Sequence, residues 1–351
     1  MSCTLKDVAK AAGVGVSTAS YVLSGKGLHK ISPSTQKHIL DTAQKLGYRV
    51  NLAGRLLHGG ASKIIGIFEE YRSVAIFSNL MQLVCRELKA RGYETYYRTG
   101  IEGPTAKDQE QEAINDFMSH GVDGIIFAYF NQQEHFSREK CPVPSIVFDG
   151  TDYDIRVNLK QCAYVVAKHL LEHGHRKIGY LLPDDQHNVD KLAGYRQALQ
   201  EFGVEVQADW LIKVYPTPNW EQEINEKIKN HNLTAICCSN DFYAIKLITY
   251  LQWKGYKVPE DIAITGFDGI SLVDSLQIPL TTVIQPVNEC AISIANTMIR
   301  KIEENNMTRL DTPLQLDGQL HIGNSCGCTK HCKPEINWEA TTIHYPQMQT
   351  K

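Results

Sequence analysis

The sequence predicts an α/β core of two doubly wound parallel-sheet lobes, preceded by a small all-α head. Its 351 residues suffice for two or three compact units, and 43% hydrophobic with 21% charged residues is typical of a globular protein. Residues 1–63 carry nine Lys and Arg against two acidic residues, whereas the remainder carries 27 against 37. Net charges of +7 and −10 therefore indicate that the head, and not the core, meets a polyanion.

The head contains three short helical patterns with readable ends. Thr4 and Asp7 have the spacing of a capping box, which starts a first helix. Residues 16–23 form a second helical pattern after a glycine-containing turn. Ser32, followed by proline, caps a third helix that Gly47 ends.

The short turn between the first two helices predicts a helix-turn-helix, whose second helix lies in the DNA major groove. A small helical bundle with a solvated polar face is the alternative. The excess of basic residues favours DNA, because cations bind backbone phosphates. The candidates for this contact are Lys6, Lys10, Lys26, Lys30, Lys37 and Arg49.

The core alternates between short apolar runs and helix-length amphipathic segments. Strands interleaved with helices predict parallel sheets covered on both faces, and about nine strands suit two lobes better than one sheet. A ligand in such sheets binds at the carboxyl ends of the strands. The expected strands are residues 64–68, 95–98, 124–129, 145–149, 177–182, 211–215, 235–239, 262–267 and 281–284.

No feature of the sequence predicts an enzyme, a cofactor or a membrane protein. No nucleophile with its base and no phosphate loop is evident, and no apolar run reaches the length that spans a bilayer. The amino terminus has no apolar signal core, and seven of the ten cysteines are scattered, which suits a reduced cytoplasmic protein. We therefore expect a cytoplasmic protein without catalytic residues.

A cluster of cysteines ends the sequence. Cys326, Cys328, His331 and Cys332 could in principle supply three thiolates and an imidazole to zinc, or act as a redox switch. Structural zinc sites commonly use two separated pairs of ligands, however, and this cluster spans only seven residues. We therefore predict no metal.

Motifs throughout the sequence resemble those of the lactose-repressor (LacI/GalR) family. The resemblance covers about residues 4–325 and implies a DNA-binding head, a hinge helix and a core like that of periplasmic sugar-binding proteins. The motifs are Thr4-Leu5-Lys6-Asp7-Val8-Ala9, Ala12-Gly13-Val14, Ser17-Thr18-Ala19-Ser20, Leu46-Gly47-Tyr48, Asn51, Gly174-His175-Arg176-Lys177-Ile178, Ala193-Gly194-Tyr195, Ser239-Asn240-Asp241, Gly266-Phe267-Asp268 and Leu280-Thr281-Thr282-Val283.

The domain organisation follows from that resemblance. We expect a helix-turn-helix head, a hinge helix, a two-lobed core that also dimerises, and a tail that contains the clustered cysteines. In order, these are residues 1–49, 50–62, 63–325 and 326–351, with lobe 1 at about 63–160 plus 286–325 and lobe 2 at about 161–285.

The resemblance also implies DNA-binding roles. Val16, Ser17 and Tyr21 would read base edges, and the hinge would insert Leu57 into the minor groove. Gly54 weakens the hinge helix, so we expect it to fold only on the operator; a plain flexible linker is the alternative. Backbone contacts are implied for Thr4, Thr18, Ser20, Ser32, Thr35, Asn51 and Arg55.

The core would hold a small-molecule effector, by the same resemblance. Carboxylates and amides bond vicinal hydroxyl groups of a sugar, and an aromatic ring covers its C–H face. Lys191 stands where relatives usually have arginine, and we interpret Asp241 as a helix N-cap. The implied effector residues are Tyr71, Phe77, Asp149, Lys191, Trp220, Asn240 and Asp268.

The resulting hypothesis is a homodimeric transcriptional regulator, a repressor of a carbohydrate-utilisation operon, whose effector changes hinge geometry and affinity for a palindromic operator. Two alternatives stay open. One is a periplasmic-type sugar-binding or transport module, which leaves the basic head without a role. The other is a corepressor-type regulator that responds to purines or sugar phosphates.

Overall fold

A computed structural model describes the protein at residues 3–24, 28–48, 61–69, 75–100, 106–129, 138, 141–150, 152–183, 188–214 and 220–328. The chain divides into two compact units, residues 1–63 and residues 64–351. Among the described residues, no helix has both the length and the apolar character needed to cross a bilayer. The two units are described in turn.

The head is a bundle of three α-helices around a small apolar core. The predicted capping box is present, since the hydroxyl group and backbone N–H of Thr4 both donate to the Asp7 carboxylate. Val8, Ala19 and Ile39 are each at most 2% exposed and join the three helices. All three predicted helices are confirmed: α1 (Leu5–Ala11), α2 (Val16–Ser24) and α3 (Pro33–Lys45), with a short η1 (Leu28–Lys30).

Lobe 1 of the core is a parallel six-stranded sheet with the strand order β11-β5-β4-β3-β1-β2. Alternate residues of β1 face opposite sides, so Ile67 packs towards α5 and α11 while Phe68 packs towards α6. The strands are β1 (Ile64–Glu69), β2 (Glu94–Thr99), β3 (Gly124–Ala128), β4 (Ser145–Phe148), β5 (Ile155–Val157) and β11 (Leu314–Leu316); the helices are α5 (Ala75–Ala90), α6 (Ala106–Ser119) and α11 (Val287–Glu303).

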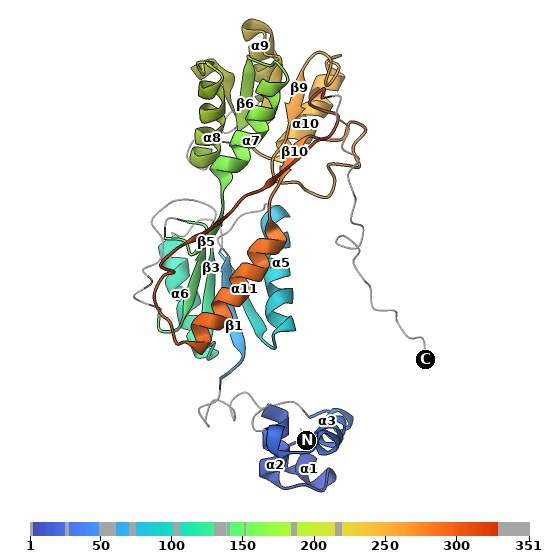
Figure 1. Cartoon of the computed structure of the whole chain (residues 1–351), viewed down its shortest axis with the longest axis vertical. Helices are drawn as coiled ribbons and strands as arrows, with labels where there is room; N and C mark the ends of the chain where they lie inside the picture. The colour runs from blue at the N-terminus through green and yellow to red at the C-terminus, as the bar shows by residue number, and fades with distance from the viewer. Residues whose placement is uncertain are drawn as a thin grey trace. The chain divides into compact units, whose positions relative to one another are not determined.

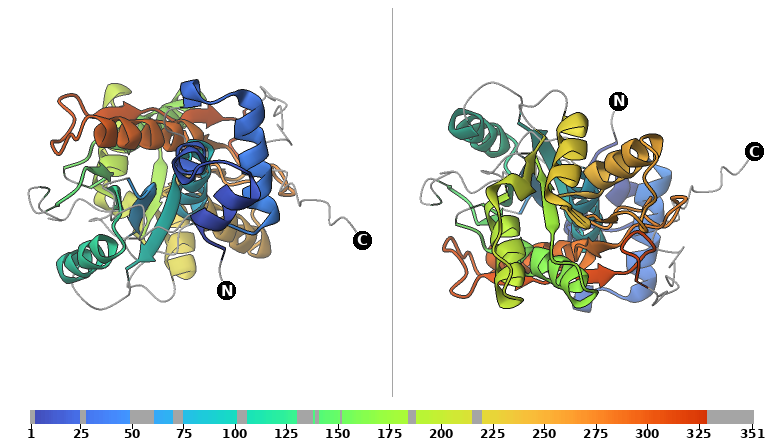
Figure 2. Two further views of the ribbon diagram at one scale, coloured as in Figure 1. Left: turned by 90° about the horizontal axis from the view of Figure 1, so that it is seen from below. Right: turned by 90° about the horizontal axis from the view of Figure 1, so that it is seen from above.

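Lobe 2 is a parallel four-stranded sheet with the order β7-β6-β8-β9. Helices α7 and α8 pack together on one side of it and α9 and α10 lie on the other (Figure 2). Gly194 permits the close crossing of α7 and α8, because a Cβ atom there would lie 2.0 Å from the Lys160 carbonyl oxygen. The elements are α7 (Leu159–Glu172), β6 (Ile178–Leu182), α8 (Val189–Glu201), η4 (Ala208–Trp210), β7 (Leu211–Lys213), α9 (Trp220–His231), β8 (Ala235–Cys238), α10 (Asp241–Trp253) and β9 (Ala263–Thr265).

The chain passes between the lobes three times (Figure 1): after β5, after β10 (Thr282–Ile284), and between β11 and β12 (Gln319–His321). Strands β10 and β12 pair with each other in antiparallel fashion. All nine predicted strands are present, whereas β5, β11 and β12 were not predicted from sequence. We expected 286–325 within lobe 1; the structure places β11 there, but the backbone N–H of Ile264 in lobe 2 donates to the Ser325 carbonyl oxygen.

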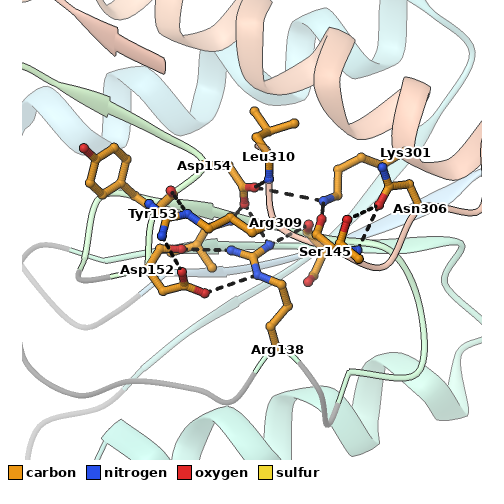
Figure 3. A network of polar contacts seen from close by, with 11 residues as sticks. Arg138, Ser145, Asp152, Tyr153, Asp154, Lys301, Asn306, Arg309 and Leu310 are labelled. Atoms are coloured by element: carbon orange, nitrogen blue, oxygen red, sulfur yellow. Dashed lines mark hydrogen bonds and ion pairs between the residues drawn. The ribbon is translucent and has the colours of Figure 1, made fainter. Parts of the chain in front are cut away.

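A network of buried charges fixes the loops of lobe 1 (Figure 3). Asp154 is fully buried and accepts hydrogen bonds from Arg138 Nη1 and the backbone N–H of Val147, each at 2.8 Å, and from that of Leu310 at 2.9 Å. The Lys301 ammonium lies 4.0 Å from the same carboxylate. Two buried cations and two amides thus compensate this carboxylate, as a buried charge requires.

Candidate functional site

Helix α2 of the head presents an exposed face that the small core does not use. Val16 and Tyr21 are 44% and 53% exposed, and Ser17 is exposed as well, whereas Ala19 and Val22 are buried. Large exposed side chains on a short helix suit insertion into a groove. The three predicted base-reading residues are therefore all accessible.

Of the predicted phosphate-contacting residues, Thr4, Ser32 and Thr35 lie at helix N-termini. Ser32 caps α3 by accepting from the backbone N–H of Thr35 at 3.2 Å, and its hydroxyl lies 2.8 Å from the Thr35 hydroxyl. Thr4 caps α1, and Thr18 and Ser20 are half-buried on α2. Unpaired backbone N–H groups at such termini bind anions. The predicted hinge residues Asn51, Arg55 and Leu57 lie outside the described residues, as does Tyr71 of the core.

In the core, Asp149 and Asp268 each follow the carboxyl end of a strand, β4 in lobe 1 and β9 in lobe 2. Both have positive φ angles, 59° and 110°, which are unfavourable for residues other than glycine and which cluster at functional sites. Lys191 of α8 interacts electrostatically with both carboxylates. The fold therefore brings together three of the predicted effector residues.

The charges of this cluster are poorly compensated. Burial raises the pKa of Asp149 to about 7 against the opposing effect of Arg156, and raises the pKa of Asp268 to about 6 against that of Lys191. Burial likewise lowers the pKa of Lys191. Among the described residues, neither carboxylate forms an ion pair with a Lys or Arg side chain. Low solvation and few partners favour a bound ligand at this position.

Lys191 and its neighbours define the chemistry of the cluster. Lys191 Nζ donates to the Ser239 carbonyl oxygen at 2.7 Å and lies 3.8 Å from the centroid of the Phe267 ring. Gln285 Nε2 donates to Asp268 Oδ1 at 2.7 Å. Within the described chain, Arg156 Nε and the Ser239 hydroxyl are buried without a hydrogen-bond partner. Buried unpaired groups of this kind indicate that a ligand or water completes them.

Sequence reasoning missed several residues around this cluster. Arg156 of β5 pairs with Asp190 of α8 at 3.4 Å and so joins the two lobes. Gln285 and Arg156 lie in or next to three-residue strands, where no periodic pattern identifies them. Their proximity to Asp268 and Asp149 arises only from the tertiary fold.

The other predicted effector residues have structural contacts. Asn240 caps α10 by accepting from the backbone N–H of Tyr243 at 2.8 Å. Trp220 is 7% exposed and lies edge-on to Tyr243, with ring centroids 6.3 Å apart. Phe77 is half-buried and lies edge-on to Phe148 at 6.4 Å. Trp220 and Phe77 therefore contribute to the packing of the core.

The interpretation of Asp241 as an N-cap is wrong, because Asn240 occupies that position. Asp241 is instead buried and accepts from the Thr282 hydroxyl at 2.6 Å and the backbone N–H of Ile270 at 2.9 Å. Burial raises the pKa of Asp241 to about 7. It therefore adds a third carboxylate beside Asp268 and Lys191.

The structure places a different histidine next to the predicted cysteine cluster. Cys326 and Cys328 are buried and lie next to His169 of α7, whereas His331 and Cys332 lie outside the described residues. His169 is 4% exposed, although it lies near the end of α7. The apolar stripe of α7 gave a signal for its burial, since Cys162 and Val166 precede it at helical spacing on the same face.

Comparisons with known proteins agree with this architecture. A family model described as bacterial regulatory proteins of the lacI family matches residues 4–51, and one described as a periplasmic binding protein-like domain matches residues 167–326. Catabolite control protein A of Priestia megaterium is 30% identical over 305 residues, which cover 82% of this chain and 89% of that protein.

Two further matches extend the likeness. The maltose regulon regulatory protein MalI of Escherichia coli (strain K12) is 27% identical over 339 residues, covering 89% of this chain and 97% of that protein. The crystal structure of the lac repressor dimer bound to operator and the anti-inducer ONPF shares the fold, with a TM-score of 0.75 at 19% identity, covering 93% of this chain and 99% of that one. This chain therefore belongs to the LacI family of transcriptional regulators, with a helix-turn-helix head and a periplasmic-binding-like core.

Proposed function

We propose that the protein is a cytoplasmic, homodimeric repressor whose effector is held by Asp149, Lys191 and Asp268 and weakens operator binding. The observation that carries this proposal is the cluster of under-compensated buried charges drawn from both lobes. A ligand that completes such a cluster stabilises one arrangement of the lobes over another, which is the requirement for coupling to a distant site. The protein would catalyse no reaction.

The chemistry of the cluster favours a neutral polyol. Asp149, Asp241 and Asp268 lie near only two cations of the described chain, Lys191 and Arg156, and Arg156 already pairs with Asp190, so little net positive charge remains to hold a phosphate group. Carboxyl groups instead hydrogen-bond to sugar hydroxyl groups, whereas the buried Phe267 ring packs against the Lys191 ammonium. We therefore propose a sugar or sugar derivative in preference to a sugar phosphate or purine.

Operator binding would depend on two heads. Val16, Ser17 and Tyr21 offer no bidentate arginine contact to guanine, so each head supplies modest specificity and two heads on a palindrome supply more. A titration of DNA binding against salt should give a log–log slope of several units, because each neutralised phosphate contributes roughly −0.9. A slope of zero would favour a transport module. Leu57→Ala should weaken operator binding far more than non-specific binding, and equal losses would exclude a wedge role.

A thermal-shift screen of sugars, sugar phosphates and purines should identify the effector. A hit is then added to the operator titration. Weaker operator binding supports induction, and by reciprocity the operator should weaken effector binding by the same factor. Tighter operator binding would instead establish a corepressor and reverse the proposed sign.

A further inference from the structure

The end of the described chain brings two thiols against a buried histidine, and the proposed effector function uses none of these groups. His169 Nε2 lies 3.3 Å from Cys326 Sγ, and the possible ligand atoms of His169, Cys326 and Cys328 all lie within 4.8 Å of one another. Each residue is at most 4% exposed. We infer that these three side chains form a zinc site that fastens the C-terminal segment to α7 of lobe 2.

The backbone around the two cysteines is already ordered for this role. Gly327 has a φ angle of +73°, which a residue with a side chain rarely adopts, and the resulting turn places both thiols near one imidazole. Ser325 anchors the segment, because its hydroxyl donates to the Ile264 carbonyl oxygen at 2.6 Å and accepts from the backbone N–H of Thr281 at 2.9 Å. The ligand geometry therefore does not depend on a metal to form it.

The donor set suits zinc. Thiolate and imidazole are its preferred ligands, and tetrahedral bonds of about 2.3 Å to sulfur and about 2.0 Å to nitrogen place neighbouring ligand atoms a little under 4 Å apart. The observed spacing needs only a small contraction to reach that geometry. Binding would displace the two thiol protons to solvent and leave one of four positions for water or a further donor.

The sequence argued against zinc because its candidate ligands all lay within seven residues. The position of His169 in the chain answers that objection. A cluster confined to the last cysteines offers ligands at one place in the chain, whereas His169 lies 157 positions before Cys326. Ligands from two distant segments are the usual arrangement of a structural zinc site, which ties those segments together. Here the segments are a helix of lobe 2 and the chain that returns from lobe 1.

The test uses the full-length chain, reduced and stripped of metal. Titration with Co²⁺ should give thiolate charge-transfer absorption that saturates at one ion per chain, and Zn²⁺ should abolish it by displacement. Cys328→Ser and His169→Gln should each weaken zinc binding at least about tenfold, because loss of a ligand costs no less than loss of a second-shell partner. Cys85→Ser is the matched control, since that half-buried thiol lies in lobe 1 and should leave zinc affinity unchanged.

The assignment also has a readout in the unmodified protein. Stoichiometric Zn²⁺ should raise its thermal unfolding temperature, which does not depend on whether the variants fold. Absence of metal uptake by the unmodified chain would overturn the assignment. So would unchanged affinity in His169→Gln, which would place the metal on the terminal cysteines alone. No effector or operator enters either measurement, so the result is independent of the proposed function.

Discussion

Two groups of buried charge in the core differ in how fully the protein compensates them. Around Asp154, two cations and two backbone amides satisfy a single carboxylate, and the elements that they join all belong to lobe 1 (Figure 3). Around Lys191, three carboxylates with raised pKa values come from both lobes. The contrast teaches that burial alone does not identify a ligand site. What distinguishes the second group is incomplete compensation at the carboxyl ends of strands.

The largest expected effect comes from breaking the compensated group. Asp154→Ala leaves Arg138 and Lys301 buried without their carboxylate, so we expect the free energy of unfolding to fall by about 3–5 kcal/mol. Urea denaturation at neutral pH measures this change. A loss below about 1 kcal/mol would show that the Asp154 group is no better compensated than the Lys191 group.

Removing a carboxylate from the cluster around Lys191 should reduce effector binding but should not reduce the stability of the free protein. Asp268→Asn keeps an acceptor for Gln285 but removes a buried charge, so the stability of the free protein should stay equal or rise. The stabilisation by effector, about 2.7 kcal/mol at a hundredfold excess over Kd, should largely disappear. Thermal shift with the effector measures both quantities, and Asp209→Asn on the surface of lobe 2 is the control. Full retention of the shift would remove Asp268 from the proposed site.

The pH dependence of the free energy of unfolding should also reveal the under-compensated charge of Asp268. The pKa of Asp268 is about 6 in the folded chain and near 3.8 when unfolded, so the folded state binds more protons between these values. Its contribution to stability therefore falls as pH rises from about 4 to about 6, by at most about 1.4 kcal/mol per unit. Burial lowers the pKa of His169 to about 4, which makes stability rise with pH in the same range. This effect is the same in the Asp268→Asn variant and in the unmodified chain. Urea denaturation across this range should show a difference between Asp268→Asn and the unmodified chain that grows with pH; parallel curves would contradict it.

The smallest effect is expected at the rim of the compensated group. Asp152 pairs with Arg138 at 3.3 Å and Arg309 at 3.0 Å, but its side chain is 50% exposed. Solvent screening limits such pairs, so Asp152→Ala should cost about 0–1 kcal/mol in urea denaturation. A cost comparable to that of Asp154→Ala would mean that the exposed ion pairs, and not the buried carboxylate, hold these loops.

The sequence predicted those features that depend on local pattern. Capping residues such as Thr4 and Ser32 located the head helices, and apolar runs located nine strands of the core. Asp149 and Asp268 could be identified as candidates because they follow strand ends. Arg156 could not, since its three-residue strand has no periodicity.

Other features required the tertiary fold. His169 contacts Cys326, a residue far along the chain, and no local pattern predicts that contact. Asp241 was misinterpreted for a related reason. Adjacent polar residues at a helix start compete for the cap, and only the positions of Thr282 and Ile270 decide which residue turns inward.

The three passages between the lobes constrain the order in which the protein can fold during synthesis. The head is contiguous and can close as soon as it leaves the ribosome. Lobe 1 lacks its edge strand β11 until the sheet of lobe 2 has been made, as the hydrogen bond from Asn158 to Asp317, 159 positions later, illustrates. Lobe 2 likewise waits for Ser325. The sheet of lobe 1 therefore keeps β5 as an unpaired edge while the sheet of lobe 2 is made, and an unpaired edge invites aggregation and chaperone binding.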